Sequence, residues 1–283
     1  MKDFLAQYMP PDYSLHGPRL DELNAYVHWL MLILFVIWGA LFAYMLIRFR
    51  ASNHPKADYH GTKSHVSTWG EIAVAVVELV LLFGISIPAW SNWTTPPGPE
   101  TNPLEIRVIA QQFNWNIHYP GPDHVFGKAD PKFITDTNQI GLDPNDPNGK
   151  DDVMTVNQLH IELNRAVIVR LSSKDVIHSF GLPVMRVKQD AIPGMEVPIH
   201  FTPVHATPKG EEWNIACAQL CGIGHANMKG YLVVQTKQDF EAWLKENAPV
   251  TAAPATPAPA AAPQAAPAEP AAPAPAAEAP AHT

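Results

Sequence analysis

Two long apolar runs, separated by a short polar stretch, dominate the first third of the chain. The first run, Tyr26–Ile47, carries no formal charge over 22 residues. As a helix it would be about 33 Å long, enough to cross the hydrocarbon core of a bilayer. The second run is Ile72–Trp90, with Trp90 and Trp93 as an interfacial belt. A buried core helix seldom needs so long an uncharged stretch as the first run. The pattern therefore predicts a transmembrane helical hairpin over 26–93, with spans at about 26–47 and 72–92 and a loop at 48–70.

Loop charge predicts the orientation of this hairpin. The loop holds four basic residues and the N-terminal segment 1–25 holds two: Arg48, Arg50, Lys56 and Lys63 against Lys2 and Arg19. The positive-inside rule then places the loop in the cytoplasm of a bacterial inner membrane, with both termini on the periplasmic side. The first residues contain no apolar h-region of a signal peptide. Either the first span inserts by itself or a leader has been removed.

One carboxylate interrupts the second span. Glu78 lies within the apolar run, and Glu71 lies seven residues earlier at the cytoplasmic end. Seven residues make about two helical turns, so both carboxylates should fall on one face, roughly 10 Å apart along the axis. Glu78 could bond a polar group on a partner helix, or the pair could line a proton route from the cytoplasm. Either interpretation implies a partner membrane subunit.

The pattern changes after the hairpin to short strands with turn signals between them. Runs such as "LEIRVIA", "AVIVRLS", "EWNIACA" and "GYLVVQT" indicate a β-sandwich or barrel over 95–247. A short helix, "QDFEAWLKEN", should close this domain, and the polar stretch Gly141–Asp152 should form a solvated loop between strands. In residues 248–283, Ala and Pro fill 28 of 36 positions, which predicts an extended, disordered tail.

Composition narrows the function of the β domain. The chain has 283 residues and a formal net charge of −8, which argues against a nucleic-acid partner. Its only two cysteines both lie in "CAQLCGIGHANMKG", residues 217–230. A disulfide is the default for two cysteines outside the cytoplasm, but it explains neither His225 nor Met228. Soft thiolate and thioether ligands with imidazole favour copper, and methionine is a poor zinc ligand.

The number of thiols bears on the kind of copper site. A mononuclear blue-copper centre uses one Cys, two His and a distant Met, so this stretch has one thiolate too many and one histidine too few. Two thiolates on one loop could instead bridge two copper ions. The candidate for the second histidine is His178, in "SSKDVIHSFGLPVMRVKQDAIPG", which follows a strand. Loops distant in sequence meet at one end of a Greek-key sandwich, so His178 could meet the 217–228 loop.

These motifs together carry a resemblance to a known family. The pattern C-x3-C-x3-H-x2-M and the upstream "KDVIHSF" resemble subunit II of the haem–copper cytochrome c oxidases, and the likeness extends over about residues 20–246. The resemblance implies a dinuclear CuA centre on a cupredoxin Greek-key barrel, with Cys217 and Cys221 bridging two copper ions. It further implies His178 and His225 as ligands to one copper each, and weak ligation by Met228 and by the backbone carbonyl of Gln219. Asp175 and Asp190 are candidates to hydrogen-bond the histidines.

The resemblance also implies a role and partners. In this family, subunit II accepts electrons from cytochrome c or an equivalent donor and passes them to haem in subunit I, where oxygen is reduced and protons are pumped. The expected partners are therefore subunits I and III, a donor and the membrane. Glu71 matches the family carboxylate at the mouth of one proton pathway. The β domain has a net charge of about −5 over 95–247, which could steer a basic cytochrome.

Three positions depart from the family pattern. The family usually has Glu between the cysteines, where its side chain helps bind magnesium, so Gln219 puts that second metal in doubt. In "QFNW", residues 112–115, Phe113 takes the place of the tryptophan that receives electrons, followed by Trp115. The donor could therefore be an unusual cytochrome or a fixed partner complex. Glu78 stands where the family has proline.

Two other protein classes remain as alternatives. A thioredoxin-like copper chaperone also uses CxxxC and a distant His, but it needs a βαβ pattern near the cysteines. A structural subunit II without copper would have lost the cysteines.

Overall fold

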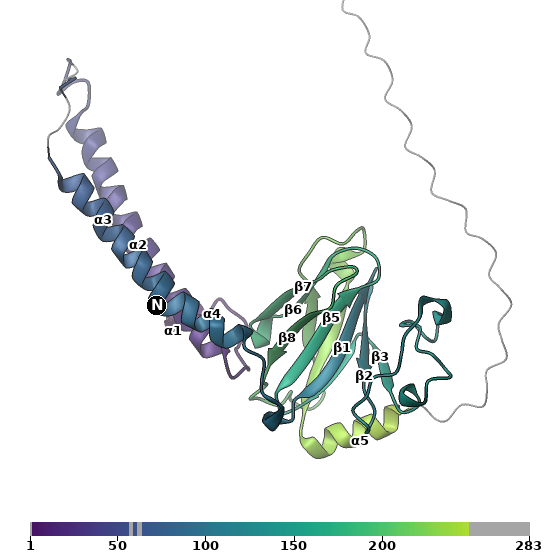
Figure 1. The fold of residues 1–283 in the computed structure, drawn as a ribbon. Coiled ribbons are helices and arrows are strands. Elements are labelled where there is room, and N and C mark those ends of the chain that lie inside the picture. Colours follow the sequence, from purple (N-terminus) through teal and green to yellow (C-terminus); the bar gives the residue numbers. More distant parts are fainter. Residues whose placement is uncertain (1, 57–58, 61–63, 249–283) are drawn as a thin grey trace, which may run out of the picture. The chain divides into compact units, whose positions relative to one another are not determined.

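The computed structural model describes residues 2–56, 59–60 and 64–248 (Figure 1). Lys63 and the predicted tail beyond Ala248 lie outside the described residues. The chain begins with the short helix α1 (Lys2–Ala6) and the long helix α2 (Gly17–Arg48). A second helical stretch follows as α3 (Val66–Leu79), the π-helix η1 (Val80–Ser86) and α4 (Ile87–Thr94). Both stretches are long and apolar enough to cross a membrane.

The π-helix has a local cause in the sequence. Pro88 has no backbone N–H, and its ring would clash with the carbonyl four residues earlier in a regular α-helix. The chain widens there, and the N–H of Ile87 donates to the carbonyl of Leu82, five residues back. Glu71 and Glu78 precede this segment and both lie in the regular helix α3. At 3.6 residues per turn they share one face of α3, as the spacing predicts.

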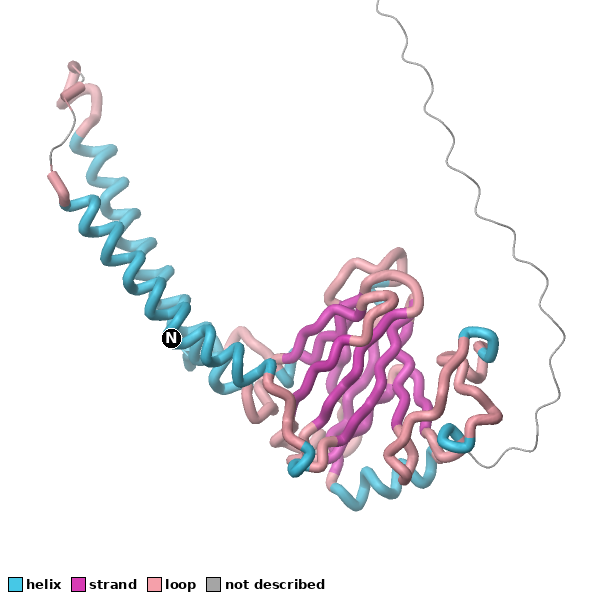
Figure 2. Tube along the Cα trace, in the orientation of Figure 1, coloured by secondary structure: helices cyan, strands magenta, loops and turns pink. Residues whose placement is uncertain are grey.

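The second part is an all-β domain of two five-stranded sheets (Figure 2). The first has the order β3-β2-β1-β5-β8 and the second β4-β10-β9-β6-β7. The strands are β1 (Leu104–Gln111), β2 (Asn114–Tyr119), β3 (Val153–Val156), β4 (Gln158–Glu162), β5 (Val167–Ser173), β6 (His178–Leu182), β7 (Val187–Ala191), β8 (Val197–Phe201), β9 (Trp213–Cys217) and β10 (Lys229–Gln235). Strands β1 and β5 alternate between buried and half-buried positions, so each turns one face to the shared core. The predicted fold class, a helical hairpin followed by an all-β domain, is confirmed.

One helix and one long loop complete the β domain. The expected closing helix is α5 (Lys237–Asn247), capped by the Thr236 side chain, which accepts from the N–H of Asp239. The predicted polar loop lies between β2 and β3, but its end is not solvated. Asp152 is buried, and its carboxylate accepts from the N–H groups of Gly121 and Gly127 and contacts His118 Nε2 at 2.6 Å. The sequence predicts that the carboxylates of this loop face solvent, but Asp152 is buried and anchors the loop.

Candidate metal centre

Two neighbouring strands and the loop between β9 and β10 supply the predicted ligands. His178 is the first residue of β6, and Cys217 is the last residue of β9. These strands pair antiparallel, with Phe180 opposite Cys217, so the pairing brings both residues to one end of the sheet. The chain then carries Cys221 and His225 before Met228, which immediately precedes β10. His178, Cys221 and Met228 are buried, and Cys217 and His225 are half-buried.

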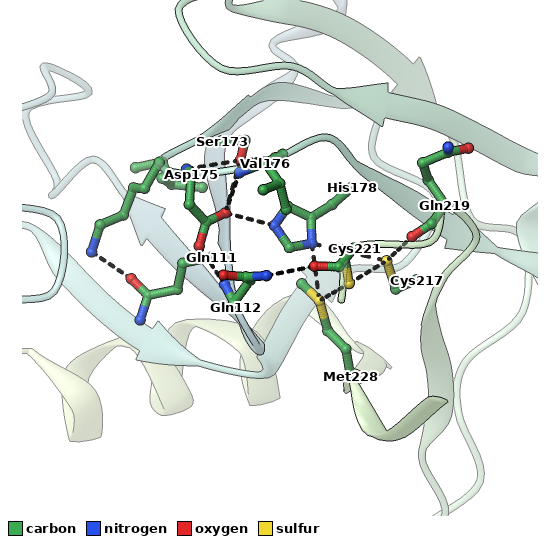
Figure 3. A network of polar contacts seen from close by, with 12 residues as sticks. Gln111, Gln112, Ser173, Asp175, Val176, His178, Cys217, Gln219, Cys221 and Met228 are labelled. Atoms are coloured by element: carbon green, nitrogen blue, oxygen red, sulfur yellow. Dashed lines mark hydrogen bonds and ion pairs between the residues drawn. The ribbon is translucent and has the colours of Figure 1, made fainter. Parts of the chain in front are cut away.

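Figure 3 shows five of the six predicted ligands close together, and His225 joins them through its contact with Cys221. The ligand atoms of His178, Cys217 and Cys221 all lie within 4.8 Å of one another. Cys217 Sγ lies 3.8 Å from Cys221 Sγ, 4.0 Å from His178 Nδ1 and 3.2 Å from the carbonyl oxygen of Gln219. Cys221 Sγ lies 3.7 Å from His225 Nδ1 and 3.8 Å from the sulfur of Met228. His178 Nδ1 lies 3.2 Å from the Met228 sulfur. Both cysteines are free, so no disulfide joins them.

These separations fit side chains that share a metal ion. Bonds of about 2.3 Å to sulfur and about 2.05 Å to nitrogen, at a tetrahedral angle, place ligand atoms roughly 3.6 to 3.8 Å apart. The observed sulfur–sulfur and sulfur–nitrogen distances of 3.7 to 4.0 Å are close to that spacing. Two thiols, two imidazoles and a thioether are soft or borderline donors, which suits copper better than magnesium or calcium. The residues present therefore fit a copper centre.

Asp175 fixes the orientation of His178. Its Oδ1 lies 2.8 Å from His178 Nε2 and accepts from the N–H of Val176 at 2.7 Å. A carboxylate accepts, so Nε2 carries the ring proton and Nδ1 turns its lone pair toward the sulfurs. Burial raises the pKa of Asp175, but hydrogen bonds from Gln112 N–H, His178 and Val176 N–H outweigh burial and hold the pKa below its usual value. Asp175 thus stays ionised and keeps its acceptor role.

The other candidate, Asp190, does not reach a histidine in the part of the chain that the structure describes. It lies in β7, opposite Ser179, and no hydrogen bond joins its carboxylate to a ligand residue. The sequence does not separate the two candidates, because both are acidic residues near His178 along the chain and nothing in the pattern shows which one contacts the ring. The hydrogen bonds of the folded turn separate them.

The thiol of Cys221 is protonated at neutral pH while no metal is bound. Burial raises its pKa to about 11, and the neighbouring Cys217 thiol adds to the rise. Because the thiolate is the metal ligand, metal binding must displace this proton.

Phe113 packs directly on the ligand loop. A side chain at Gly224 would come within 2.5 Å of the Phe113 ring, and one at Gly222 within 3.3 Å. Gly222 also has a φ of +133°, which only glycine adopts readily. The two glycines therefore let the loop close over the aromatic ring.

Trp115 lies deeper than Phe113. It is fully buried, with its ring centroid 5.4 Å from that of Phe180 and 6.2 Å from that of His178. It therefore cannot touch a donor at the surface, although it lies beside a ligand. Glu71 and Glu78 lie on α3, outside this centre.

Gln112 is the residue of this site that sequence reasoning missed. Its side-chain Nε2 donates to the carbonyl of Cys221 at 2.6 Å, and its backbone N–H donates to Asp175 Oδ2 at 2.7 Å. The only signal in the sequence was its place at the start of the "QFNW" motif.

Comparisons with known proteins place the centre in context. Residues 104–236 match the family model described as cytochrome c oxidase subunit II, periplasmic domain. The chain is 30% identical to the alternative cytochrome c oxidase subunit 2 of Bradyrhizobium diazoefficiens over 229 residues, covering 80% of this chain and 79% of the relative. It is 30% identical to a probable cytochrome c oxidase subunit 2 of Rickettsia conorii over 233 residues, covering 81% and 68%. The crystal structure of the periplasmic domain of subunit II of a Bradyrhizobium japonicum cytochrome oxidase is similar at a TM-score of 0.36 and 23% identity, covering 51% of this chain and 92% of that one.

Proposed function

The chain belongs to the cytochrome c oxidase subunit II family, and from this premise we propose that it holds two copper ions and receives the electrons used by the oxidase. The observation that carries the proposal is the clustering of six donor groups at one end of the β domain, in which neighbouring donor atoms lie 3.2 to 4.0 Å apart. The ligand atoms of His178, Cys217 and Cys221 all lie within 4.8 Å of one another. The ligands are His178, Cys217, Cys221, His225, Met228 and the carbonyl of Gln219. When bound, the copper ions supply one-electron redox chemistry between cytochrome c, or an equivalent donor, and haem in subunit I.

The residues of the chain prepare this chemistry in three ways. Cys217 and Cys221 would hold the metal as thiolates, and Asp175 holds His178 in the tautomer that offers Nδ1. Strands β6 and β9 carry His178 and Cys217, so paired backbones fix both residues. A centre held on such strands changes little when its charge changes, which favours fast electron transfer.

We propose Phe113 as the aromatic that receives electrons, with Trp115 behind it. Phe113 packs on Gly222 and Gly224 in the ligand loop, and Trp115 lies beside His178. The Phe113 ring is in contact with the loop that carries Cys221, so an electron on that ring would be close to the ligands. The excess of acidic residues over 95–247 supports a basic donor, since opposite charge speeds association.

The proposed partners are subunits I and III, with the β domain on the periplasmic side. The N-terminal segment supports this orientation. The N–H of Tyr13 donates to the carbonyl of Val184, and the N–H of Leu15 donates to the carbonyl of Thr202. These contacts support a placement of the segment before the first span and the β domain on the same side of the membrane, which two spans would also require. The basic residues of the 48–70 loop favour the cytoplasm for the other side.

We propose that this chain does not supply a magnesium ligand from Gln219. Its carbonyl oxygen faces Cys217 Sγ at 3.2 Å, and its side chain is exposed. Magnesium prefers carboxylate oxygens in a strict octahedral arrangement, and the neutral amide of Gln219 lacks that charge.

We further propose that Glu71 and Glu78 line a proton-uptake route from the cytoplasm. They share one face of α3, about 10 Å apart along the axis. Carboxylates in a membrane span usually face protein or water and serve such pathways. The test is Glu78→Gln in the assembled oxidase. Slower turnover and proton uptake are expected, and unchanged values of both would refute the role of Glu78.

The central experiment is copper analysis with electron paramagnetic resonance on the purified complex that contains the full chain. Two copper ions at this centre, with a hyperfine pattern from one electron shared between two nuclei, are expected. A pattern from a single copper nucleus would favour the chaperone interpretation. Absence of copper from this centre would favour a structural subunit.

A further inference from the structure

We propose that Gln112 is a positioning residue: its side chain holds the copper-ligand loop, residues 218–228, against the turn that carries Phe113. The relevance of this contact to electron transfer rests on the proposed function. The contact itself is a property of the folded chain.

The bond from Gln112 to the loop is short and long-range in sequence. Nε2 of Gln112 donates to the carbonyl of Cys221 at 2.6 Å, across 109 residues of sequence. Figure 3 shows the Gln112 side chain extended toward that carbonyl, beside the cluster of sulfur atoms. Cys221 Sγ is within 3.8 Å of three other donor atoms, so a shift of its backbone would change each of those distances.

The loop has few other attachments. Two backbone bonds involve residues 219–224, from His225 N–H to the Gly222 carbonyl and from Asn227 N–H to the Gly224 carbonyl, and both stay within the loop. The Gln219 carbonyl contacts only the thiol of Cys217. At the start of the loop the N–H of Ala218 donates to the carbonyl of Ser179 in β6, and the Cys217 thiol at the end of β9 contacts Gln219 and Cys221. Among the residues that the structure describes, the Gln112 side chain, from the turn between β1 and β2, is the one hydrogen-bonding group outside β9 and the loop itself that contacts residues 219–224.

Steric contacts show that Gln112 and Phe113 act on the loop together. A side chain at Gly222 would come within 2.7 Å of Gln112 Nε2, and one at Gly224 within 2.5 Å of the Phe113 ring. The loop thus fits closely over both side chains. Glycine at both positions makes the close approach possible.

Gln112 also reaches the opposite side of the centre through its backbone. Its N–H donates to Asp175 Oδ2 at 2.7 Å, while Asp175 Oδ1 faces His178 Nε2 at 2.8 Å. One residue therefore connects the turn of Phe113 to a histidine ligand through its main chain and to a cysteine ligand through its side chain. A side-chain substitution leaves the first connection in place and removes only the second.

The test compares Gln112→Met with Gln111→Met. Methionine has nearly the length of glutamine but cannot donate a hydrogen bond. Gln111 is the adjacent residue, and its side chain bonds Gln139 and Lys174 instead of the ligand loop. Gln112→Asn is the second variant, because it keeps the amide but is too short to reach Cys221. If the methionine variant fails to fold, the same measurements are made on Gln112→Asn.

The first readout uses the copper-free full-length chain in detergent, in a Cys217→Ser background. Cys221 is buried, so a thiol reagent reaches it only when the loop opens. Loss of a hydrogen bond should speed Cys221 labelling about threefold to tenfold in Gln112→Met. Gln111→Met should label at the parent rate. Equal rates in both variants would overturn the inference.

The second readout uses the assembled oxidase with its native cysteines. Copper should pass to a chelator about threefold to tenfold faster in Gln112→Met than in Gln111→Met. If the parent complex holds no copper at this centre, the proposed function fails, and the labelling result still decides the role of the Gln112 side chain. If the parent holds copper and the two variants lose it equally fast, only the inference on Gln112 fails.

Discussion

Replacing Asp175 with asparagine should weaken copper binding, because Asp175 uses two acceptor oxygens and asparagine has only one. Both carboxylate oxygens accept from N–H groups: Oδ1 faces His178 Nε2 at 2.8 Å and Oδ2 faces Gln112 N–H at 2.7 Å. An asparagine side chain offers one acceptor and one donor. Whichever way the amide turns, one N–H group then faces another donor, so either the His178 ring or the Gln112 backbone loses its partner.

The expected size of the effect follows from the kind of bond. A hydrogen bond to a charged group contributes about 1.5 to 3 kcal/mol, and losing a partner of a metal-binding histidine typically costs about 10- to 100-fold in metal affinity. The Asp175 side chain is 31% exposed, so water can replace part of the lost bond. We therefore expect the lower part of that range, about tenfold to thirtyfold.

The assay is the rate of copper transfer from the purified oxidase to a chelator, with copper content measured before the reaction. Asp190→Asn is the matched control. It is the same substitution, and the Asp190 carboxylate makes no hydrogen bond to a ligand residue. The fold should be unchanged in both variants, since Asp175 lies in a surface turn outside the core. Copper loss from Asp175→Asn within twofold of the control would refute the assigned role.

Three further predictions concern the residues around the centre. Phe113→Ala should raise the KM for the donor roughly tenfold, because it truncates an aromatic anchor; unchanged donor kinetics with intact copper would place the docking site elsewhere. Gln219→Glu should allow the complex to bind Mn²⁺ in place of Mg²⁺, detected by paramagnetic resonance, since it restores a carboxylate; the same Mn²⁺ content in parent and variant would contradict this. Trp115→Leu should lower the free energy of unfolding by roughly 2 to 4 kcal/mol, because the ring is fully buried against Phe180; an unchanged denaturation midpoint of the full chain would refute it.

The sequence was most informative where chemistry and spacing coincide. Two thiols, an imidazole and a thioether within twelve positions indicated the ligand loop, and His178 stood out because it follows a strand. The structure brings these donor atoms to within 3.2 to 3.8 Å of a neighbour, although their roles as copper ligands stay a prediction. The long apolar runs likewise predicted two helices long enough to span a membrane.

The sequence was least informative where the role of a residue depends on where it points. Asp175 and Asp190 looked equivalent, and only the turn after β5 gives Asp175 its bond to His178. In the sequence Gln112 was one polar residue of a turn, and only the fold places its side chain beside Cys221. Asp152 lay in a loop rich in polar residues, yet it is buried against His118 and two backbone N–H groups. The contacts of Gln112 and Asp152 join residues 25 to 109 positions apart, and no local pattern encodes them. Asp175 and His178 are three positions apart, and the shape of the turn between them decides their contact.

The strand order has a consequence for the biogenesis of the centre. The two sheets include parallel pairs, β1 with β5 and β4 with β10, and β10 closes its sheet only after nearly the whole domain has been synthesised. Pairings between distant segments form slowly. Cys217 through Met228 immediately precede β10, so their final positions depend on one of the last strands to dock. We therefore expect the proposed metal to bind only after β10 has docked, and the half-exposed Cys217 and His225 mark the side of the centre that solvent can reach.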